Sequence, residues 1–412
     1  MSNATTTTSA AILKSQYTQE RVYWITYKNN PAIGSVRKDE AFIGDYKYVA
    51  TQIETPQGGG ITVPLAQSHL APGVYKRWQL TRKNDYALAR VSGEALKAAE
   101  SDDGSLIQLW TREMDGAVHT IKRSWAIHFF RNGTGSRGQI SSGSNVASSS
   151  ITLALISDIT AFSVGMTLQA ANTDGGTLRN SGANAVVTKI DRANGILTFG
   201  DVLSNYIGAV AANDYLLREG DNNGVILGTS AWVPSTTVTN TLFNNLDRSV
   251  DPIRLAGQPV NTQGMTLREA IIEGCARVDV EGGEPDTVWL HPRDKATLVK
   301  ELEGKSIYAK EVSATLEGVD ASIGYDALEA EFDGNKMLIR SDINVRRQTG
   351  WVTDWKTWGL DTLGPFPHIV DYDTLDFVRV YNDDAFEVRV AGRGDVENLA
   401  PAYTAQLFNL GT

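Results

Sequence analysis

The feature of this sequence that most limits its fold is a pair of strand-like runs separated by a long, Gly- and Pro-rich stretch. The first run, residues 46–53, is rich in aromatic and β-branched residues. In the second run, residues 74–82, the apolar residues Val74, Trp78 and Leu80 alternate with polar neighbours. A hairpin with a flexible tip, here called the tongue, is therefore predicted. Because an isolated two-stranded ribbon is only marginally stable in water, the tongue needs another surface to lie on.

A long amphipathic helix is predicted after the tongue. Between Leu106 and Phe130, apolar residues recur every three or four positions, which places them on one face of a helix. Asp102 or Asp103 offers an N-cap, and the glycines near residue 133 offer a stop. At 1.5 Å per residue, such a helix is roughly 40 Å long. Its predicted apolar face consists of Leu106, Trp110, Met114, Val118, Ile121, Trp125 and Phe129.

The composition changes sharply at about residue 138. Residues 138–220 contain only ten charged side chains and are otherwise dominated by Ser, Gly, Ala, Asn, Thr and Val. Within them, the runs 185–190 and 195–199 flank a turn-forming segment, which predicts a β-hairpin. We expect a small all-β module inserted into the main domain, with flexible Ser- and Gly-rich linkers at its ends.

From Met265 onward the pattern is that of alternating helices and strands. Thr266 and Glu269 have the spacing of a capping box, and Pro292 is placed to begin a second helix. A short buried strand, residues 287–290, lies between the two helices. Strand-like runs close the chain, at residues 336–340, 345–358, 377–381, 385–390 and 402–408.

Length and charge limit the class of protein. The chain has 412 residues, which exceeds the roughly 250–300 that one core supports, so two or more domains are expected. Its net charge of -10 argues against a nucleic-acid or anionic-membrane binder held by overall charge. No stretch approaches the roughly 18 apolar residues of a membrane span, and no secretory signal is visible at the N-terminus. The single cysteine, Cys275, excludes a disulfide framework and a zinc site of several thiolates.

No residue pattern typical of a catalytic, cofactor or metal site is found. The glycines of the tongue lack the lysine and the preceding buried strand of a phosphate-binding loop, and there is no Gly-x-Ser-x-Gly elbow. The five histidines show no helical metal-binding spacing. Asp371 and Asp373 are interpreted as turn residues, and the glycines of the 392–394 segment as a connection between strands. We therefore expect no catalytic residue, no cofactor and no metal.

Two segments of the sequence carry strong local charges of opposite sign. Residues 72–90 carry a local net charge of +4, and residues 311–333 a local net charge of -7. Two solvated loops would explain this pattern; the sharper hypothesis is that the tongue of one copy is attracted to an acidic surface on its neighbour, which sets register more than affinity. The predicted contact residues of the tongue are Gly58, Gly59, Gly60, Lys76, Arg77, Trp78, Arg82 and Lys83. The predicted acidic counter-surface consists of Glu311, Glu317, Asp320, Asp326, Glu329, Glu331 and Asp333.

The order of these parts resembles the major capsid proteins of tailed bacteriophages, the Hong Kong 97-like family. That order is an arm, a long β-tongue, a long helix, an α/β section and terminal strands. Short phrases also resemble family segments: Phe42-Ile43-Gly44-Asp45 before the tongue, residues 77–86 after it, Thr287-Val288-Trp289-Leu290-His291-Pro292, and the closing run 401–408. The similarity spans residues 40–136 and 223–412.

The resemblance implies an α+β fold with an N-terminal arm, an extended β-loop, a peripheral domain with a long spine helix, and an axial domain. The all-β module is an addition to that fold. The implied parts are the N-terminal arm (1–41), the extended hairpin or E-loop (42–86), the peripheral domain with the spine helix (87–137), the inserted β-rich module (138–220), the axial domain and its connections (221–345), the peripheral-domain strands (346–400) and the closing strand (401–412).

The resemblance also implies a structural, non-enzymatic function. Many copies would assemble as hexamers and pentamers of an icosahedral head around double-stranded DNA, built in the cytoplasm of a bacterial host and kept as the virion capsid. Further implied partners are a separate scaffolding protein, since only about 40 residues precede the tongue, a portal and in some cases a decoration protein. Packaged DNA would be held weakly and without sequence preference, and no membrane is involved. The alternatives are an encapsulin-type nanocompartment shell, which shares the fold, and a carbohydrate-binding surface β-protein, which the nine tryptophans support.

Overall fold

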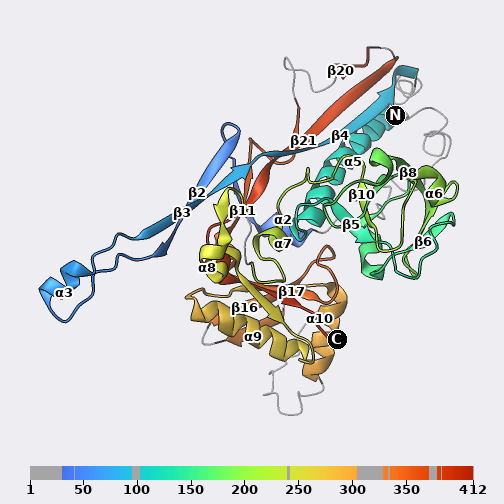
Figure 1. The fold of residues 1–412 in the computed structure, drawn as a ribbon. Coiled ribbons are helices and arrows are strands. Elements are labelled where there is room, and N and C mark those ends of the chain that lie inside the picture. The colour runs from blue at the N-terminus through green and yellow to red at the C-terminus, as the bar shows by residue number, and fades with distance from the viewer. Residues whose placement is uncertain are drawn as a thin grey trace, which may run out of the picture.

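Three clusters of buried apolar side chains organise the protein in this computed structural model. One cluster lies between a long helix and a central sheet, one fills a β-rich module, and one lies in an α/β section that includes the end of the chain. A two-stranded tongue projects away from all three (Figure 1). The structure describes residues 30–40, 42–94, 103–238, 242–303, 328–332, 335–370, 378–381 and 383–411.

The tongue is the hairpin that the sequence predicts. β2 (Tyr46–Glu54) and β3 (Val74–Thr81) pair antiparallel, and a short helix, α3 (Val63–Ser68), lies at the tip. The tip folds closely on itself, since a Cβ on Gly60 would lie 2.6 Å from the backbone nitrogen of Ala66. In Figure 1 the tip is the part of the tongue that lies farthest from the body.

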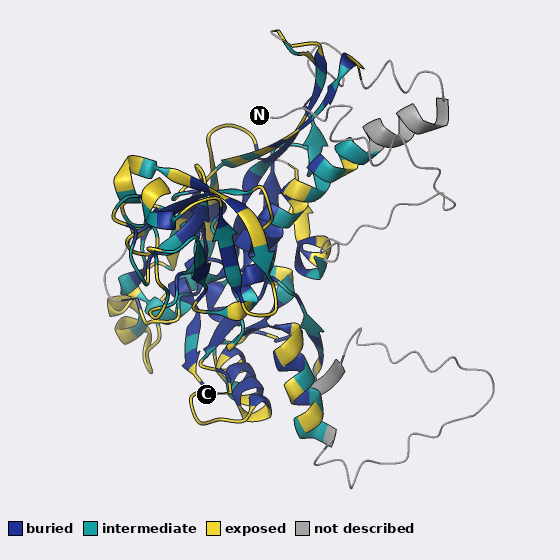
Figure 2. Cartoon of the chain, turned by 90° about the vertical axis from the view of Figure 1, so that its right-hand side faces the viewer, coloured by how far each residue is buried: buried dark blue, intermediate teal, exposed yellow. Residues whose placement is uncertain are grey.

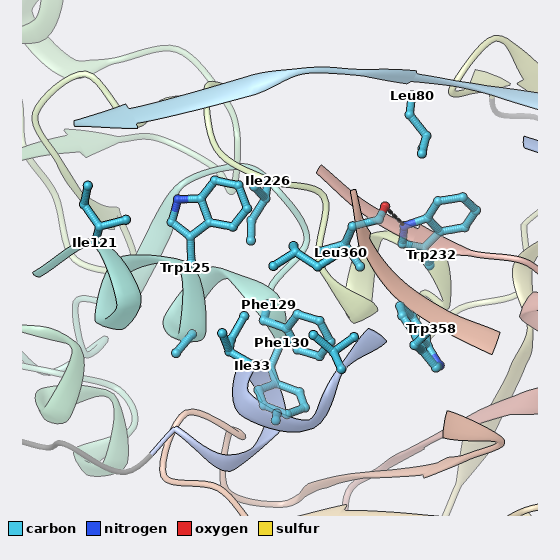
Figure 3. Close-up of a cluster of buried hydrophobic side chains, with 14 of the residues drawn as sticks. Ile33, Leu80, Ile121, Trp125, Phe129, Phe130, Ile226, Trp232, Trp358 and Leu360 are labelled. Carbon is cyan, nitrogen blue, oxygen red and sulfur yellow. Dashed lines mark hydrogen bonds between the residues drawn. The ribbon is translucent and has the colours of Figure 1, made fainter. Parts of the chain in front are cut away.

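The predicted long helix is confirmed as α5 (Asp103–Phe129). Its buried face includes Ile121, Trp125 and Phe129, which pack in the central cluster shown in Figure 3. The side chains of residues 103–111, which include the predicted Leu106 and Trp110, lie outside the described part of the chain. The helix therefore presents the expected apolar face wherever its side chains are described.

A six-stranded sheet packs against α5 through its two longest strands, β4 (Lys83–Ser92) and β21 (Ala385–Asn398). The strand β4 was not predicted from the sequence, and the predicted run 385–390 proves to be the start of the much longer β21. The remaining strands are β1 (Arg37–Asp39), β18 (Trp358–Thr362), β19 (His368–Ile369) and β20 (Val378–Arg379).

The prediction of a turn at residues 392–394 is wrong, because Gly392 and Gly394 lie inside β21. A Cβ on Gly394 would lie 2.0 Å from the carbonyl oxygen of Asp361 on β18, and a Cβ on Gly392 would lie 2.7 Å from the ring of Phe366. Gly394 thus permits the close approach of β18, and Gly392 leaves room for the ring of Phe366. A sequence pattern does not separate this role of glycine in strands from a turn.

The stretch from Ser136 to Arg218 forms a second six-stranded sheet with its own core, the β-rich module. The predicted hairpin is confirmed as β8 (Asn184–Asp191) paired with β9 (Ile196–Phe199). The first and last strands of the module are neighbours, so the chain enters and leaves it side by side. The other strands are β5 (Ser136–Gln139), β6 (Ser150–Thr152), β7 (Thr167–Ala171) and β10 (Tyr215–Arg218).

The α/β section has a third six-stranded sheet with two helices, α9 (Leu267–Val280) and α10 (Pro292–Glu303). The capping box at Thr266 and Glu269 is confirmed. Both helices carry buried residues on one face and exposed residues on the other (Figure 2). The strands in sheet order are β13 (Gln258–Asn261), β22 (Thr404–Phe408), β17 (Thr349–Thr353), β14 (Thr287–Leu290), β16 (Asn335–Ser341) and β15 (Leu328–Phe332).

The predicted continuous strand over residues 345–358 is wrong. It is broken by a 3₁₀ turn, Trp355–Thr357, which Asp354 caps by accepting a hydrogen bond from the backbone N–H of Lys356 at 3.3 Å. The break sends β17 and β18 to different sheets, so this turn joins the α/β section to the central sheet. The short connecting elements are α2 (Pro31–Ser35), α6 (Leu203–Tyr206), α7 (Thr229–Trp232), α8 (Pro252–Ala256), β11 (Leu242–Phe243) and β12 (Leu246–Asp247).

Of the helices in the described ranges, none combines the length and the apolar character needed to cross a lipid bilayer.

Candidate inter-subunit surface

The root of the tongue, residues 46–51 and 76–81, is anchored in the body by aromatic side chains. Trp78 and Leu80 are 0% exposed. The ring of Trp78 meets the ring of Trp232 edge to face with 5.5 Å between centroids, and Trp232 packs in the same way on Phe243 at 5.1 Å. The indole N–H of Trp232 donates to the carbonyl of Val396 at 3.1 Å (Figure 3). Trp78 is therefore a core residue of its own chain, and its prediction as an inter-subunit contact is wrong.

A charge cluster also holds the root. The Nζ of Lys47 on β2 donates to Asp361 at 2.7 Å and to Asp39 at 2.8 Å, and lies 3.6 Å from Glu397. Arg37 pairs with the same Glu397. Burial acts to lower the pKa of Lys47, but the hydrogen bonds to the two aspartates outweigh it and raise this pKa to about 12. The lysine therefore stays charged and ties the tongue to two strands of the central sheet.

A buried carboxyl group next to this cluster predicts a pH-dependent stability. Asp395 on β21 is the direct cross-strand neighbour of Asp361 on β18. Its Oδ1 accepts hydrogen bonds from the backbone N–H groups of Leu227 and Val396, both at 2.8 Å. Burial raises the pKa of Asp395 from 3.8 to about 7, despite these hydrogen bonds. Between pH 4 and 7 the native chain thus holds a proton that the unfolded chain has released. Stability from this group is greatest below pH 4 and is lost as the pH rises to 7.

We expect this loss to appear in the difference between wild type and Asp395→Asn, whose amide does not titrate. The wild-type free energy of unfolding minus that of the variant should fall by up to about 1.4 kcal/mol per pH unit between pH 5 and 7, and level off above pH 8. Urea denaturation of the unassembled chain over this pH range measures it. A difference independent of pH would contradict the raised pKa.

The tip of the tongue, residues 55–73, is exposed and carries apolar side chains that were not among the predicted contact residues. Ile61 is 96% exposed and Leu70 76%, and Tyr75, just beyond the tip on β3, is 67% exposed. Val74 is also exposed, although it shares the predicted alternation with Trp78 and Leu80. Exposed apolar clusters of this kind mark interaction surfaces. The available signal was the presence of apolar residues between two strand-like runs in an otherwise polar loop. The exposed apolar residues of the tip are Ile61, Val63, Leu65 and Leu70.

The predicted basic residues are divided between the tongue and the body. On β3, Lys76 is half-buried, and the exposed Arg77 places its guanidinium over the ring of Tyr48 at 4.6 Å. Arg82 donates to the carbonyl of Gly44 at 3.1 Å, and Lys83 to that of Asn223 at 3.4 Å. Arg82 and Lys83 therefore lie beyond the tongue, where they contact their own chain. The predicted Gly58, Gly59 and Gly60 lie at the tip.

The predicted acidic counter-surface is described only in part. Glu329 and Glu331 lie on β15, the edge strand of the third sheet. The other five residues, Glu311, Glu317, Asp320, Asp326 and Asp333, lie outside the described residues. In the described ranges, no group of three or more His, Cys, Asp or Glu side chains is arranged to hold a metal ion.

The tryptophans that supported a carbohydrate-binding site are mostly core residues. Six of the nine are buried, which leaves those six rings unable to act as sugar-stacking platforms. They are Trp78, Trp125, Trp232, Trp289, Trp351 and Trp358.

Comparison with solved structures confirms the predicted fold. A chain of the capsid asymmetric unit of cyanophage A-1(L) superposes with a TM-score of 0.60 at 9% sequence identity, over 99% of this chain and 100% of that one. Two others have lower scores. A holo-encapsulin chain from Synechococcus elongatus has a TM-score of 0.48 at 8% identity, covering 97% and 94% of the two chains, and a chain from Mycobacterium phage Ogopogo has 0.46 at 10% identity, covering 97% and 98%. No protein-family model matches the sequence, and no curated protein matches it. The chain has the α+β, Hong Kong 97-like capsid fold, in which the β-rich module forms a separate sheet with its own core.

Proposed function

We propose that this chain is the major capsid protein of a tailed bacteriophage, a structural subunit that assembles into the icosahedral shell around double-stranded DNA. The observation that carries the proposal is the tongue, which projects from the body and exposes apolar side chains at its tip. The fold shared with a cyanophage capsid chain supports the same function. A subunit of this shape becomes complete when other copies cover the tip.

The proposed contact is between the tip of one copy and the body of the next. Fully burying an Ile or Leu side chain contributes about 1.5–3 kcal/mol, and Ile61 and Leu70 are almost entirely available for burial. Each copy would give one tongue and receive one. Such a head-to-tail contact closes into rings when the rotation between copies allows it, as hexamers and pentamers require.

The proposed charge contact between neighbouring copies now involves only two of the four predicted basic residues. Lys76 and Arg77 lie on the tongue itself, and we assign them to the acidic 311–333 segment of a neighbouring copy. Glu329 and Glu331 belong to that segment and lie on an edge strand. Attraction of this kind sets the register of neighbouring copies and weakens as salt is added.

The remaining partners follow from the same function. We propose that a separate scaffolding protein, a portal and in some heads a decoration protein act with this chain, and that assembly takes place in the bacterial cytoplasm. The net charge of -10 favours weak, non-specific contact with packaged DNA. The α/β section, which takes in the predicted axial domain (221–345) together with β17 and β22, would meet its copies at the capsomer centre. The peripheral parts would carry the tongue and the β-rich module.

Electron microscopy of the chain, expressed alone and together with its proposed scaffolding protein, tests the proposal. We expect closed icosahedral shells with six-fold and five-fold capsomers. DNA inside particles from infected cells would separate a phage head from an encapsulin-type compartment, which holds enzyme cargo. A chain that stays monomeric at high concentration under these conditions would contradict the proposed function.

A further inference from the structure

A basic cavity lies between the spine helix α5 and the β-rich module, away from the tongue. Its volume is about 410 Å³, within the range of small-molecule sites. Four arginines and a histidine line it, and the described lining residues include no Asp or Glu. These five residues are His119, Arg123, Arg137, Arg192 and Arg218.

The four arginines come from four different elements. Arg123 lies on α5, Arg137 on β5 and Arg218 on β10, and Arg192 lies in the turn between β8 and β9. Their positions in the sequence span almost one hundred residues. The packing of the module on the helix is therefore what brings their charges together.

Backbone carbonyls of one segment hold three of these arginines in place. At the end of the 3₁₀ helix Ile156–Ala161, Arg192 donates to the carbonyls of Ile159 at 3.2 Å and Phe162 at 3.3 Å. Arg137 donates to the carbonyl of Ala161 at 3.2 Å, and Arg123 to that of Thr160. A carbonyl group is neutral, so these hydrogen bonds fix the positions of the guanidinium groups without themselves forming an ion pair. The cationic groups are thus ordered before any ligand arrives, which lowers the entropic cost of binding.

Two aspartates beside the cavity form ion pairs with two of its four arginines. Asp221 pairs with Arg218 at 2.8 Å and with Arg137 at 3.3 Å, and Asp85 pairs with Arg218 at 2.8 Å. Arg137 is buried, and its Nε has no hydrogen-bond partner. A buried donor without a partner is costly, and an anion in the cavity is a means of satisfying it.

We propose that this cavity binds a multivalent phosphate, of which pyrophosphate is the simplest example. Guanidinium groups recognise phosphate oxygens through paired, charge-assisted hydrogen bonds, and four of them around one space match an anion with several oxygens better than a single carboxylate. The phosphate could be a free anion or belong to a nucleic acid. The cavity lies between α5 and the β-rich module, and the proposed binding site does not depend on the proposed capsid function.

Titration calorimetry of the full-length, unassembled chain with pyrophosphate, at constant ionic strength in chloride, tests the site. We expect saturable binding that weakens about tenfold in Arg123→Gln and in Arg192→Gln, because each loses a charge-assisted contact. Arg192→Lys should retain part of the affinity, since it keeps the charge and loses the paired geometry. Lys189→Gln is the matched control, because Lys189 is exposed on the same module outside the cavity lining, and it should bind as the wild type does.

Further arms separate the source and class of the ligand. Competition by duplex DNA would identify nucleic-acid phosphate as the source, whereas its absence would identify the free anion; both support the site if the arginine variants lose binding. Succinate bound as tightly as pyrophosphate would overturn the assignment to phosphate. Absence of pyrophosphate binding, or equal affinity in wild type and both glutamine variants, would overturn the site itself. Melting temperatures of all variants show whether each is folded.

Discussion

Replacing Ile61 and Leu70 together by aspartate is expected to give a folded chain that no longer forms shells. Both side chains lie at the tip of the tongue, 96% and 76% exposed, so the subunit itself loses no packing. At each proposed contact, however, the change removes about 1.5–3 kcal/mol of burial per residue and adds a charge that resists desolvation. Because the contact recurs at every subunit, the loss should abolish assembly. Electron microscopy and sedimentation under assembly conditions measure the result.

Val164→Asp is the control for this experiment. Val164 is 63% exposed, but it lies on the β-rich module and not on the tongue. We expect this variant to assemble, with an unfolding midpoint close to that of wild type. Shells formed at wild-type yield by the double tongue variant would show that the tip is not an inter-subunit contact.

Elements with a strong local signal were predictable from the sequence. The helix α5 follows from the spacing of its apolar residues, and α9 from the capping box at Thr266 and Glu269. The β8–β9 hairpin follows from a turn-forming segment between two strand-like runs. In each case, the residues that determine the element lie within a few turns of one another in the chain.

The breaks and close approaches were not predictable, because distant residues decide them. Gly394 lies inside β21, and the position requires glycine because a Cβ there would lie only 2.0 Å from the carbonyl oxygen of Asp361. The run 345–358 breaks where Asp354 caps a 3₁₀ turn, and the two halves then join different sheets. Apolar content alone does not indicate to which sheet a strand belongs.

The same limit applies to the candidate surfaces. The long tip between the two strand-like runs predicts that a ribbon leaves the body. The alternation, however, places Val74 on the same face as Trp78 and Leu80 and does not show that their burial differs. Burial differs among the three because the body ends between Val74 and Trp78 along the strand. The basic cavity has no local signal at all, since its arginines meet only after the module has packed on α5.

Trp78→Ala is expected to destabilise the unassembled subunit by about 3–5 kcal/mol, the range for removing a fully buried large aromatic side chain. The ring of Trp78 is 0% exposed and packs edge to face on Trp232, which in turn contacts Phe243. Its loss leaves a cavity at the root of the tongue, next to the ring of Trp232. The midpoint of urea denaturation of the unassembled chain measures the change.

Tyr75→Ala separates this structural role from a contact between subunits. Tyr75 lies three residues away on the same strand but is 67% exposed, so its truncation should change subunit stability by less than about 0.5 kcal/mol. It should weaken assembly instead, since the exposed ring belongs to the surface that a neighbour would cover. If Trp78 were a contact between subunits, the two variants would behave alike, with assembly impaired and the subunit unchanged. If the root belongs to the core and the outer tongue contacts a neighbouring copy, the two variants differ. Trp78→Ala then lowers the stability of the subunit, whereas Tyr75→Ala impairs assembly and leaves the subunit stable.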